Sequence, residues 1–374
     1  MPEQQFMRHA IALALKGEGK TRPNPLVGAV IVKDGRIIGE GYHTKYGSLH
    51  AEREALADCR RRGESPLGAD MYVTLEPCCH TGKQPPCTEA LAESGIGRVF
   101  VGSEDPNPLV AGKGIKFLRQ HGIQVQTGFL KAECDALNPI FFHYIAAGKP
   151  YVALKYAMTA DGRIATVTGA SKWITGEAAR NHVHRLRNRY ASILVGINTV
   201  LRDDPLLNCR IPGGVNPLRI VLDSALRIPL SSHLVQSAKE IPLMVVCSDS
   251  KIKGAADKKK ALEAAGAEVL PLDSPDGRPD FKALVAELGK RSIDSLLIEG
   301  GSQVHYSALK AGIVSHIYSY VAPKIFGGTS APGPVGGYGA DAVSDAFVLH
   351  LAGIQQLGED ILIEYEVEDV YRNN

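Results

Sequence analysis

The chain carries HAE at residues 50–52 and TLEPCCHTGKQPPC at residues 74–87. A catalytic zinc site needs three protein ligands and one open position for water. His50, Cys78 and Cys87 offer one imidazole and two thiolates, which are ligand types that zinc prefers. These stretches therefore predict a zinc site, and the fold around them must bring the three side chains together.

Regular elements are predicted on both sides of these stretches. Helical periodicity runs over residues 5–17, 50–62 and 88–94, and strand-length apolar runs occupy residues 27–32, 37–42, 70–75 and 98–102. Asp34-Gly35 predicts a hairpin turn between the first two strands. His50 opens a predicted helix and Cys87 precedes another, where the helix dipole favours a thiolate. Strands followed by alternating helices and strands indicate an α/β layered domain.

Glu52 is predicted to carry protons at this site. It lies two positions after His50, and helical residues at that spacing do not share a face, so we do not expect a further ligand. Zinc lowers the pKa of bound water, and a nearby carboxylate can pass a proton from that water to a leaving amine. H-x-E with a later Pro-Cys is the signature of zinc deaminases, although here eight residues separate the two cysteines instead of two.

Three other interpretations of the zinc motif stay open. A purely structural site would close with a fourth ligand, for which Cys79 or His80 is available, or the cysteines are simply buried without a metal. The chain is alternatively a deaminase of a nucleoside, nucleotide or RNA that carries an unrelated accessory domain. The third alternative is a metal-dependent binding protein without turnover, which ammonia release dependent on zinc and Glu52 would exclude.

The composition limits the number of domains and the partners. A chain of 374 residues, 44% hydrophobic and 22% charged, suits two globular domains. Its 42 basic and 40 acidic residues nearly balance, which argues against nucleic acid or membrane partners, although residues 182–189 form a basic cluster. We find no signal-peptide pattern, no apolar stretch of ~18 residues and no disulfide framework among the seven cysteines, so we expect a cytoplasmic protein.

A second domain is predicted because the pattern restarts near residue 147. The expected domains are a deaminase over residues 1–147 and an α/β domain over residues 148–374. Its predicted strands lie at residues 151–155, 192–196, 218–222, 242–247, 294–298, 314–321 and 361–367. No GxGxxG follows a strand, so the residues alone do not identify a nicotinamide cofactor. LLIEGGS at 296–302 predicts a helix start that can face a phosphate, and residues 327–339 predict a mobile loop or lid.

Three motifs together resemble one family. HAE at 50–52, TLEPCCHTGKQPPC at 74–87 and DPNPLVAGKG at 105–114 closely resemble the bifunctional riboflavin-biosynthesis deaminase-reductases, essentially over the whole chain. The resemblance implies a cytidine-deaminase-like three-layer domain with Zn²⁺, followed by a dihydrofolate-reductase-like α/β domain that uses NADPH. The implied reactions are removal of the 2-amino group of a phosphoribosylamino-diaminopyrimidinone and reduction of its ribosyl group to ribityl.

The resemblance also implies binding residues in both domains. In the first, Asn24 and His43 are expected to line the pyrimidine pocket, and His80 and Lys83 are candidates to reach the substrate phosphate. In the second, the expected substrate-binding residues are Ser171, Arg187, Leu207 through its backbone, Arg210 and Glu299. Arg187 and Arg210 are predicted phosphate clamps, because a guanidinium fork matches phosphate oxygens in pairs.

The expected cofactor-binding residues are Ala157, Trp173, Thr199, Asp203, Ser224, Gly300, Gly301 and Ser302. Lys155 and Asp203, with Glu299, are the candidates for proton handling during hydride transfer. Two active sites in one chain lead us to expect a homo-oligomer, either a dimer or a tetramer.

Overall fold

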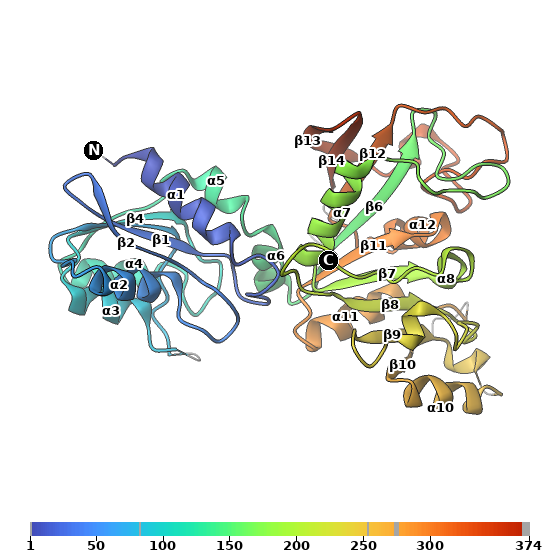
Figure 1. The fold of residues 1–374 in the computed structure, drawn as a ribbon, viewed down its shortest axis with the longest axis horizontal. Coiled ribbons are helices and arrows are strands. Elements are labelled where there is room, and N and C mark those ends of the chain that lie inside the picture. Colours follow the sequence, from blue (N-terminus) through green and yellow to red (C-terminus); the bar gives the residue numbers. More distant parts are fainter. Residues whose placement is uncertain (1, 82–83, 253, 273–276, 369–374) are drawn as a thin grey trace. The chain divides into compact units, whose positions relative to one another are not determined.

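The computed structural model describes residues 2–81, 84–252, 254–272 and 277–368. Lys83, a candidate for the substrate phosphate, lies outside the described residues. The chain divides into two units, Met1–Gly148 and Lys149–Asn374 (Figure 1). This division falls beside the restart of the sequence pattern near residue 147.

The first unit is built on a five-stranded sheet in the order β2-β1-β3-β4-β5. Its strands are β1 (Gly28–Lys33), β2 (Arg36–Tyr42), β3 (Asp70–Leu75), β4 (Arg98–Ser103) and β5 (Gln124–Gln126). β1 runs antiparallel to β2 and β3, whereas β3, β4 and β5 are parallel. Asp34 and Gly35 both have positive φ, 52° and 74°, as expected of a two-residue hairpin whose turn matches the strand twist.

Helices cover both faces of this sheet because its strands alternate apolar residues between the two faces. Val30, Tyr72 and Phe100 pack in the core cluster of α1, whereas Ile31, Met71 and Val99 pack in the cluster of α2, α3 and α4. Figure 1 shows α1 on one side of this sheet and α2 and α3 on the other. The helices are α1 (Gln4–Leu15), α2 (Ala51–Arg61), α3 (Cys87–Ser94), α4 (Lys113–Gln120), α5 (Lys131–Asp135) and α6 (Pro139–Ala147). The predicted three-layer α/β fold is confirmed.

The second unit contains a nine-stranded sheet in the order β10-β9-β8-β7-β11-β6-β12-β14-β13. Its strands are β6 (Tyr151–Thr159), β7 (Ser192–Gly196), β8 (Leu218–Leu222), β9 (Leu243–Cys247), β10 (Ala267–Pro271), β11 (Ser295–Gly300), β12 (His316–Ala322), β13 (Leu349–Leu357) and β14 (Asp360–Val367). The strands from β10 to β12 are parallel, and β14 and β13 are antiparallel. Loops that follow the parallel strands therefore meet at one edge of the sheet, where α/β proteins place ligands.

Two core clusters fill the faces of the second sheet. Val195, Val221 and Val245 belong to one cluster, and their chain neighbours Leu194 and Ile220 belong to the other. The helices of this unit are α7 (Glu177–Arg189), α8 (Ile197–Asp203), α9 (His233–Gln236), α10 (Ala256–Ala264), α11 (Phe281–Lys290) and α12 (Ser302–Lys310). Helices α8 to α10 contribute to the first cluster, and α11 and α12 contribute to the second.

Three strands have no counterpart in the sequence prediction. β5 has only three residues, and β10 mixes glutamate and proline with its apolar residues. β13 lies at the sheet edge, where Leu351 and Ile354 remain exposed, so its apolar residues do not mark a buried face. None of the helices in the described part of the chain is both long and apolar enough to cross a bilayer.

The glycine-rich segment predicted as a mobile lid is held by hydrogen bonds along its length. Asp161 accepts hydrogen bonds from the amides of Phe326 and Gly327. Further bonds join Arg163 Nη1 to the Ala331 carbonyl, the Ile164 amide to Pro332, His305 Nδ1 to Pro334 and the Gly336 amide to Ser302. In this structure the segment is therefore an anchored wall beside the end of β11.

Candidate active sites

The three predicted zinc ligands come together at the carboxyl end of β3. His50 caps the N-terminus of α2, and Cys87 is the first residue of α3. His50 Nδ1 lies 3.5 Å from Cys78 Sγ and 3.4 Å from Cys87 Sγ, and all three ligand atoms lie within 4.8 Å of one another. Tetrahedral zinc with ordinary bond lengths would separate a sulfur and a nitrogen ligand by about 3.5 Å, so these residues fit the metal.

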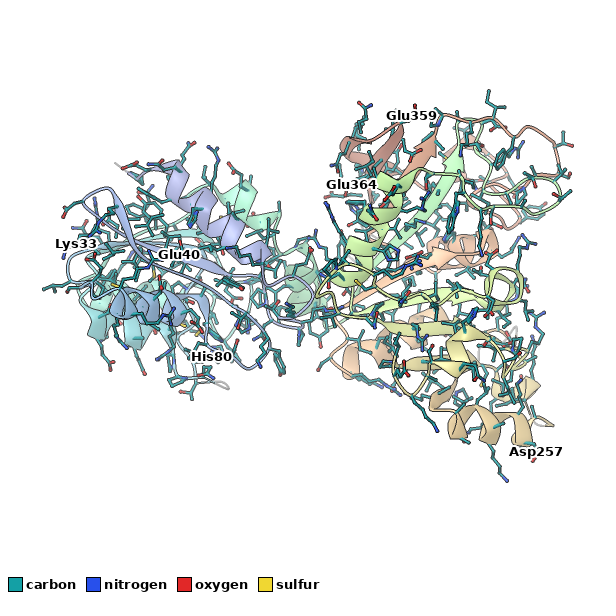
Figure 2. The ribbon with its side chains drawn as sticks, in the orientation of Figure 1. Lys33, Glu40, His80, Asp257, Glu359 and Glu364 are labelled. Carbon is teal, nitrogen blue, oxygen red and sulfur yellow. The ribbon has the colours of Figure 1, made fainter. Side chains whose placement is uncertain are left out.

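The metal group contains no fourth side chain among the described residues. Neither Cys79 nor His80 belongs to it, although His80 lies in the loop between β3 and α3 (Figure 2). Cys79 Sγ instead approaches the Leu109 carbonyl at 3.8 Å. Three ligands with an open position suit a catalytic zinc site better than a structural one.

The surroundings of Cys78 favour a thiolate. Contrary to the expectation from the helix dipole, the hydrogen bond to Cys78 and burial raise the pKa of Cys87 well above its ordinary value. The Cys87 amide at the start of α3 approaches Cys78 Sγ at 3.4 Å. The hydrogen bond from the Cys87 thiol, together with His50 and that amide, outweighs burial and lowers the pKa of Cys78 to about 4. Thiolate is the form that binds zinc.

Glu52 occupies the first turn of α2 and is only 3% exposed. Burial, assisted by the nearby Cys78 thiolate, raises the pKa of its carboxyl group to about 6. A carboxyl group with a pKa near neutrality can both accept and return a proton. Glu52 is also outside the metal group, although it lies beside Cys87.

Asn24 and His43 form a hydrogen-bonded pair next to the metal ligands. His43 Nδ1 bonds to the Leu49 carbonyl at 3.0 Å, so this nitrogen carries the proton, and Asn24 Nδ2 donates to Nε2 at 3.2 Å. Burial lowers the pKa of His43, which keeps the ring neutral and able to accept. The His43 ring centroid lies 5.4 Å from that of His50, so the two predicted pocket residues border the metal site.

Glu76 anchors the loop that contains the DPNPLVAGKG motif. Its buried carboxylate accepts hydrogen bonds from the amides of Asp105 (3.4 Å), Gly112 (3.1 Å), Gly114 (3.1 Å) and Ile115 (3.2 Å). A Cβ atom at Gly114 would lie 2.1 Å from the Pro77 carbonyl oxygen, so only glycine fits at this position. The loop is thereby fixed to the strand end that carries Cys78.

In the second unit, every predicted site residue lines one cavity of about 1540 Å³. The set comprises Lys155, Ala157, Ser171, Trp173, Arg187, Thr199, Asp203, Leu207, Arg210, Ser224, Glu299, Gly300, Gly301 and Ser302. The volume exceeds the roughly 300–1,000 Å³ typical of small-ligand pockets, which leaves room for a dinucleotide together with a sugar phosphate. Nine lysines and arginines line it against four acidic residues, which suits anionic ligands.

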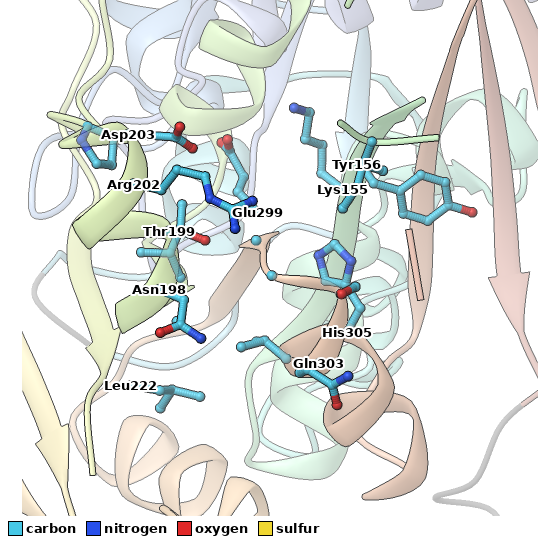
Figure 3. A pocket seen from close by; sticks show the side chains of 18 of the residues that line it. Lys155, Tyr156, Asn198, Thr199, Arg202, Asp203, Leu222, Glu299, Gln303 and His305 are labelled. Atoms are coloured by element: carbon cyan, nitrogen blue, oxygen red, sulfur yellow. The ribbon is translucent and has the colours of Figure 1, made fainter. Parts of the chain in front are cut away.

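A buried ion pair lies in this cavity. Arg187 on α7 binds Glu299 on β11 through Nε–Oε1 (2.8 Å) and Nη2–Oε2 (2.9 Å), and the two side chains are only 14% and 6% exposed. Lys155 on β6 points into the same cavity (Figure 3). Burial lowers the pKa of Lys155, while Glu299 opposes this shift. Arg187 was predicted to bind phosphate through its guanidinium group, but the Nε and Nη2 atoms of that group already donate to Glu299.

Arg210 is placed differently from Arg187. It is exposed in the cavity, and its Nε donates to His184 Nε2 at 3.0 Å. Leu207, in the same segment, has φ of +51°, a left-handed conformation that is strained for leucine and typical of functional sites. This segment thus presents its backbone and Arg210 to the cavity together.

The glycine turn between β11 and α12 is suited to a phosphate. Gly301 has φ of +83°, and a Cβ atom at Gly300 would approach Thr199 Oγ1 to 3.2 Å. Backbone amides at a helix start bind anions. Thr199 and Asp203 line the cavity from α8 (Figure 3), whereas Trp173 is 63% exposed, with the Arg180 guanidinium 4.9 Å from its ring centroid.

Sequence reasoning missed several residues that line the cavity or support a site. Lys251 and Arg278 line the cavity beyond the ends of β9 and β10, and a search for basic residues after parallel strands would have found Lys251. His184 lies in the basic stretch from which only Arg187 was selected. Glu76 has no sequence signal of its own, because its partners are backbone amides of a distant loop.

Two family models match the chain. One described as "RibD C-terminal domain" matches residues 150–363, and one described as "Cytidine and deoxycytidylate deaminase zinc-binding region" matches residues 1–103. The first match excludes an unrelated accessory domain.

Relatives and solved structures agree over both units. "Riboflavin biosynthesis protein RibD" of Actinobacillus pleuropneumoniae is 52% identical over 367 residues, covering 98% of this chain and 96% of that protein, and that of Escherichia coli is 37% identical over 376 residues, covering 97% and 99%. The crystal structure of a diaminohydroxyphosphoribosylaminopyrimidine deaminase/5-amino-6-(5-phosphoribosylamino)uracil reductase from Thermotoga maritima has a TM-score of 0.86 at 38% identity, covering 98% of each chain. Acinetobacter baumannii RibD gives a TM-score of 0.85 at 36% identity, covering 98% and 99%.

Proposed function

This chain belongs to the RibD family of bifunctional riboflavin-biosynthesis proteins, and on that premise we propose which of its residues carry out the two reactions. The first unit is a zinc-binding deaminase, and the second is an NADPH-dependent reductase. We assign to the chain the reactions for which the Thermotoga maritima relative is named. These are deamination of 2,5-diamino-6-(5-phosphoribosylamino)pyrimidin-4(3H)-one to the corresponding uracil, followed by reduction of the ribosyl chain to ribityl.

In the deaminase, His50, Cys78 and Cys87 would hold the zinc, which would lower the pKa of a bound water. Glu52 takes one proton from the attacking water at its carboxylate. It then delivers that proton to the 2-amino group, which leaves as ammonia. The proton of the hydroxyl left on C2 passes to the ring nitrogen, so that a carbonyl remains. The burial of Glu52 and its pKa of about 6 support this double role.

Asn24 and His43 orient the pyrimidine in this proposal. The Leu49 carbonyl fixes the tautomer of His43, and His43 in turn fixes the amide of Asn24. A preset amide beside His50 offers both a donor and an acceptor to the pyrimidine edge. His80, whose Nδ1 is buried without a hydrogen-bond partner among the described residues, is kept as a candidate for the substrate phosphate.

In the reductase, NADPH would supply the hydride to C1′ of the opened ribosylamine. Lys155 is our choice for handling the accompanying proton, because burial lowers the pKa of its amine and Glu299 lies beside it. Asp203 remains the second candidate, facing the cavity from α8 (Figure 3). Glu299 binds the substrate while Arg187 holds its carboxylate in place.

Separate groups hold the substrate phosphate and the cofactor. Arg210 clamps the phosphate, flanked by Ser171 and by the backbone of Leu207, and Arg187 contributes through Glu299. The cofactor is held by Ala157, Trp173, Thr199, Asp203, Ser224 and the turn formed by Gly300, Gly301 and Ser302. The convergence of all these residues on one cavity is the observation that carries the reductase assignment.

One coupled assay tests both assignments. The diaminopyrimidinone substrate should release ammonia without NADPH, and NADPH should be oxidised only once the deaminated product is present. NADPH that is neither bound nor oxidised with that product would refute the bifunctional assignment. Ammonia release that persists without zinc would refute the deaminase mechanism.

We also propose a homo-oligomer in the cytoplasm. The edge strand β13 and its neighbour β14 expose Leu351, Ile354 and Ile361 at 62%, 66% and 44%, and such an apolar edge is normally covered. A second copy of the chain is the occupant we assign, and Ile354→Lys should shift the mass measured by light scattering to that of a monomer. All seven cysteines are free thiols, which suits a reducing compartment.

A further inference from the structure

The segment that carries Arg210 is seated on helix α7 by three hydrogen bonds. Arg187 Nη1 donates to the Asn208 carbonyl at 3.2 Å, Cys209 Sγ approaches the His184 carbonyl at 3.5 Å, and Arg210 Nε donates to His184 Nε2 at 3.0 Å. Only the last of these bonds is made by the side chain of Arg210, which faces the cavity. His184 therefore sets where the Arg210 guanidinium points.

His184 can accept this bond only as a neutral imidazole. An arginine always donates, so Nε2 must carry the lone pair and Nδ1 must carry the proton. His184 is only 9% exposed, and burial, together with the charges of Arg187 and Arg210, lowers its pKa to about 4. The ring thus stays neutral at physiological pH although two guanidinium groups lie beside it.

The two arginines predicted to bind phosphate differ in how many of their guanidinium nitrogens are already hydrogen-bonded within the protein. Arg187 uses Nε and Nη2 for Glu299 and Nη1 for the Asn208 carbonyl. Arg210 is held through Nε, and within the described residues its two terminal nitrogens have no hydrogen bond. Two terminal nitrogens of one guanidinium match two oxygens of a phosphate.

We propose that His184 is a positioning residue for the reductase: by accepting from Arg210 Nε, it aims the terminal nitrogens of Arg210 at the substrate phosphate. This inference rests on the proposed function, in which Arg210 is the phosphate clamp. Without the imidazole acceptor, the exposed Arg210 side chain samples several rotamers and is ordered only when the phosphate binds. The conformational entropy that Arg210 then loses on binding weakens substrate affinity, while the groups that react with the substrate are unchanged.

Variants of His184 that keep or remove the acceptor test the proposal. His184→Gln places an amide oxygen near the Nε2 position, His184→Asn stops short of it, and His184→Phe keeps the ring shape without an acceptor. For the phosphorylated substrate, the Phe and Asn variants should raise KM about tenfold with kcat nearly unchanged. The Gln variant should keep KM close to the wild-type value. The affinity for ribose 5-phosphate, measured by calorimetry, should follow the same order.

The dephosphorylated substrate separates this inference from the function on which it rests. Arg210→Ala should remove most of the preference for the phosphorylated over the dephosphorylated substrate, and if it does not, the phosphate role of Arg210 is wrong. If Arg210→Ala does so but Gln, Asn and Phe at residue 184 behave alike, Arg210 remains the clamp and the positioning role of His184 is wrong. Ammonia release by the first unit serves as the control for intact protein, and the Asn variant decides the question should the Phe variant fail to fold.

Discussion

Replacing Glu299 with glutamine should destabilise the second unit by about 3 kcal/mol near neutral pH, because Arg187 then loses its charged partner. Burial alone would raise the pKa of Glu299, but the charge and hydrogen bonds of Arg187 and the charge of Lys155 outweigh burial and lower it from 4.5 to about 2. At about 1.4 kcal/mol for each pKa unit, this shift corresponds to about 3 kcal/mol of folding free energy.

The pH dependence of this effect has a definite sign. The folded-state pKa of Glu299 lies below that of the unfolded chain, so the stabilisation is fully present above about pH 4.5 and is lost as the pH falls toward about 2. Glutamine has no proton to take up in this range. The difference in unfolding free energy between wild type and Glu299→Gln should therefore be largest near neutrality and shrink in acid.

Urea unfolding followed by tryptophan fluorescence measures this difference, because Trp173 is the sole tryptophan and reports on the second unit. Glu268→Gln is the matched control. Its carboxylate lies 2.7 and 2.8 Å from Arg291 Nη1, but the Glu268 and Arg291 side chains are 47% and 32% exposed, so we expect less than about 1 kcal/mol. The reasoning would be refuted if both variants lowered the unfolding free energy equally. It would also be refuted if the difference in unfolding free energy between wild type and Glu299→Gln did not shrink in acid.

Four further predictions concern both units. Glu52→Gln should slow deamination at least about 100-fold while zinc content measured by metal analysis is unchanged, and lost zinc would identify Glu52 as a ligand. Chelation of zinc should abolish ammonia release and lower the melting temperature of the first unit, while NADPH oxidation continues when the deaminated product is supplied; continued ammonia release would exclude catalytic zinc. Glu76→Ala should lower the unfolding free energy of the first unit by at least about 3 kcal/mol, because four buried amides lose their acceptor; an unchanged urea midpoint by circular dichroism would contradict this. The pKa of His184 is about 4 in the folded chain against 6.5 ordinarily, so in acid the unfolded chain takes up the proton first. Between about pH 7 and 5 the unfolding free energy of the wild type should therefore fall by about 2 kcal/mol more than that of His184→Gln. Urea titrations at several pH values that give both proteins the same change in unfolding free energy with pH would disprove this.

The cluster of predicted zinc ligands could be predicted from the sequence because the chemistry of these residues and their local structure coincide. His50 and Cys87 each stand at a helix start, and Cys78 follows a strand, so hydrophobic periodicity already places them at element ends. One histidine and two cysteines in such motifs are also an uncommon combination, so the pattern itself indicates a zinc site. The same reasoning predicted the turn at Gly300 and Gly301, where the structure shows a strand that runs directly into a helix.

Sequence reasoning was weaker where function depends on a partner distant in the chain. Arg187 was predicted to clamp phosphate, yet its fork holds Glu299, which lies 112 residues away. Glu76 organises a loop through backbone amides, whose positions leave no trace in residue identity. The edge strand β13 was not predicted, because it lies at the end of the sheet and has no buried face to produce an alternating pattern.

By itself, the sequence determined the two α/β domains, the residues of the metal-binding cluster and the glycine turn, because each depends on elements that follow one another in the chain. Only the tertiary structure decided which arginine remains open to a phosphate and which is bound to a carboxylate. The physical reason is that the groups nearest to a charged side chain decide whether it can bind a ligand. The partner of Arg187 is Glu299 on β11, and the order of the strands in the sheet, not their order in the sequence, brings β11 beside β6 and β7.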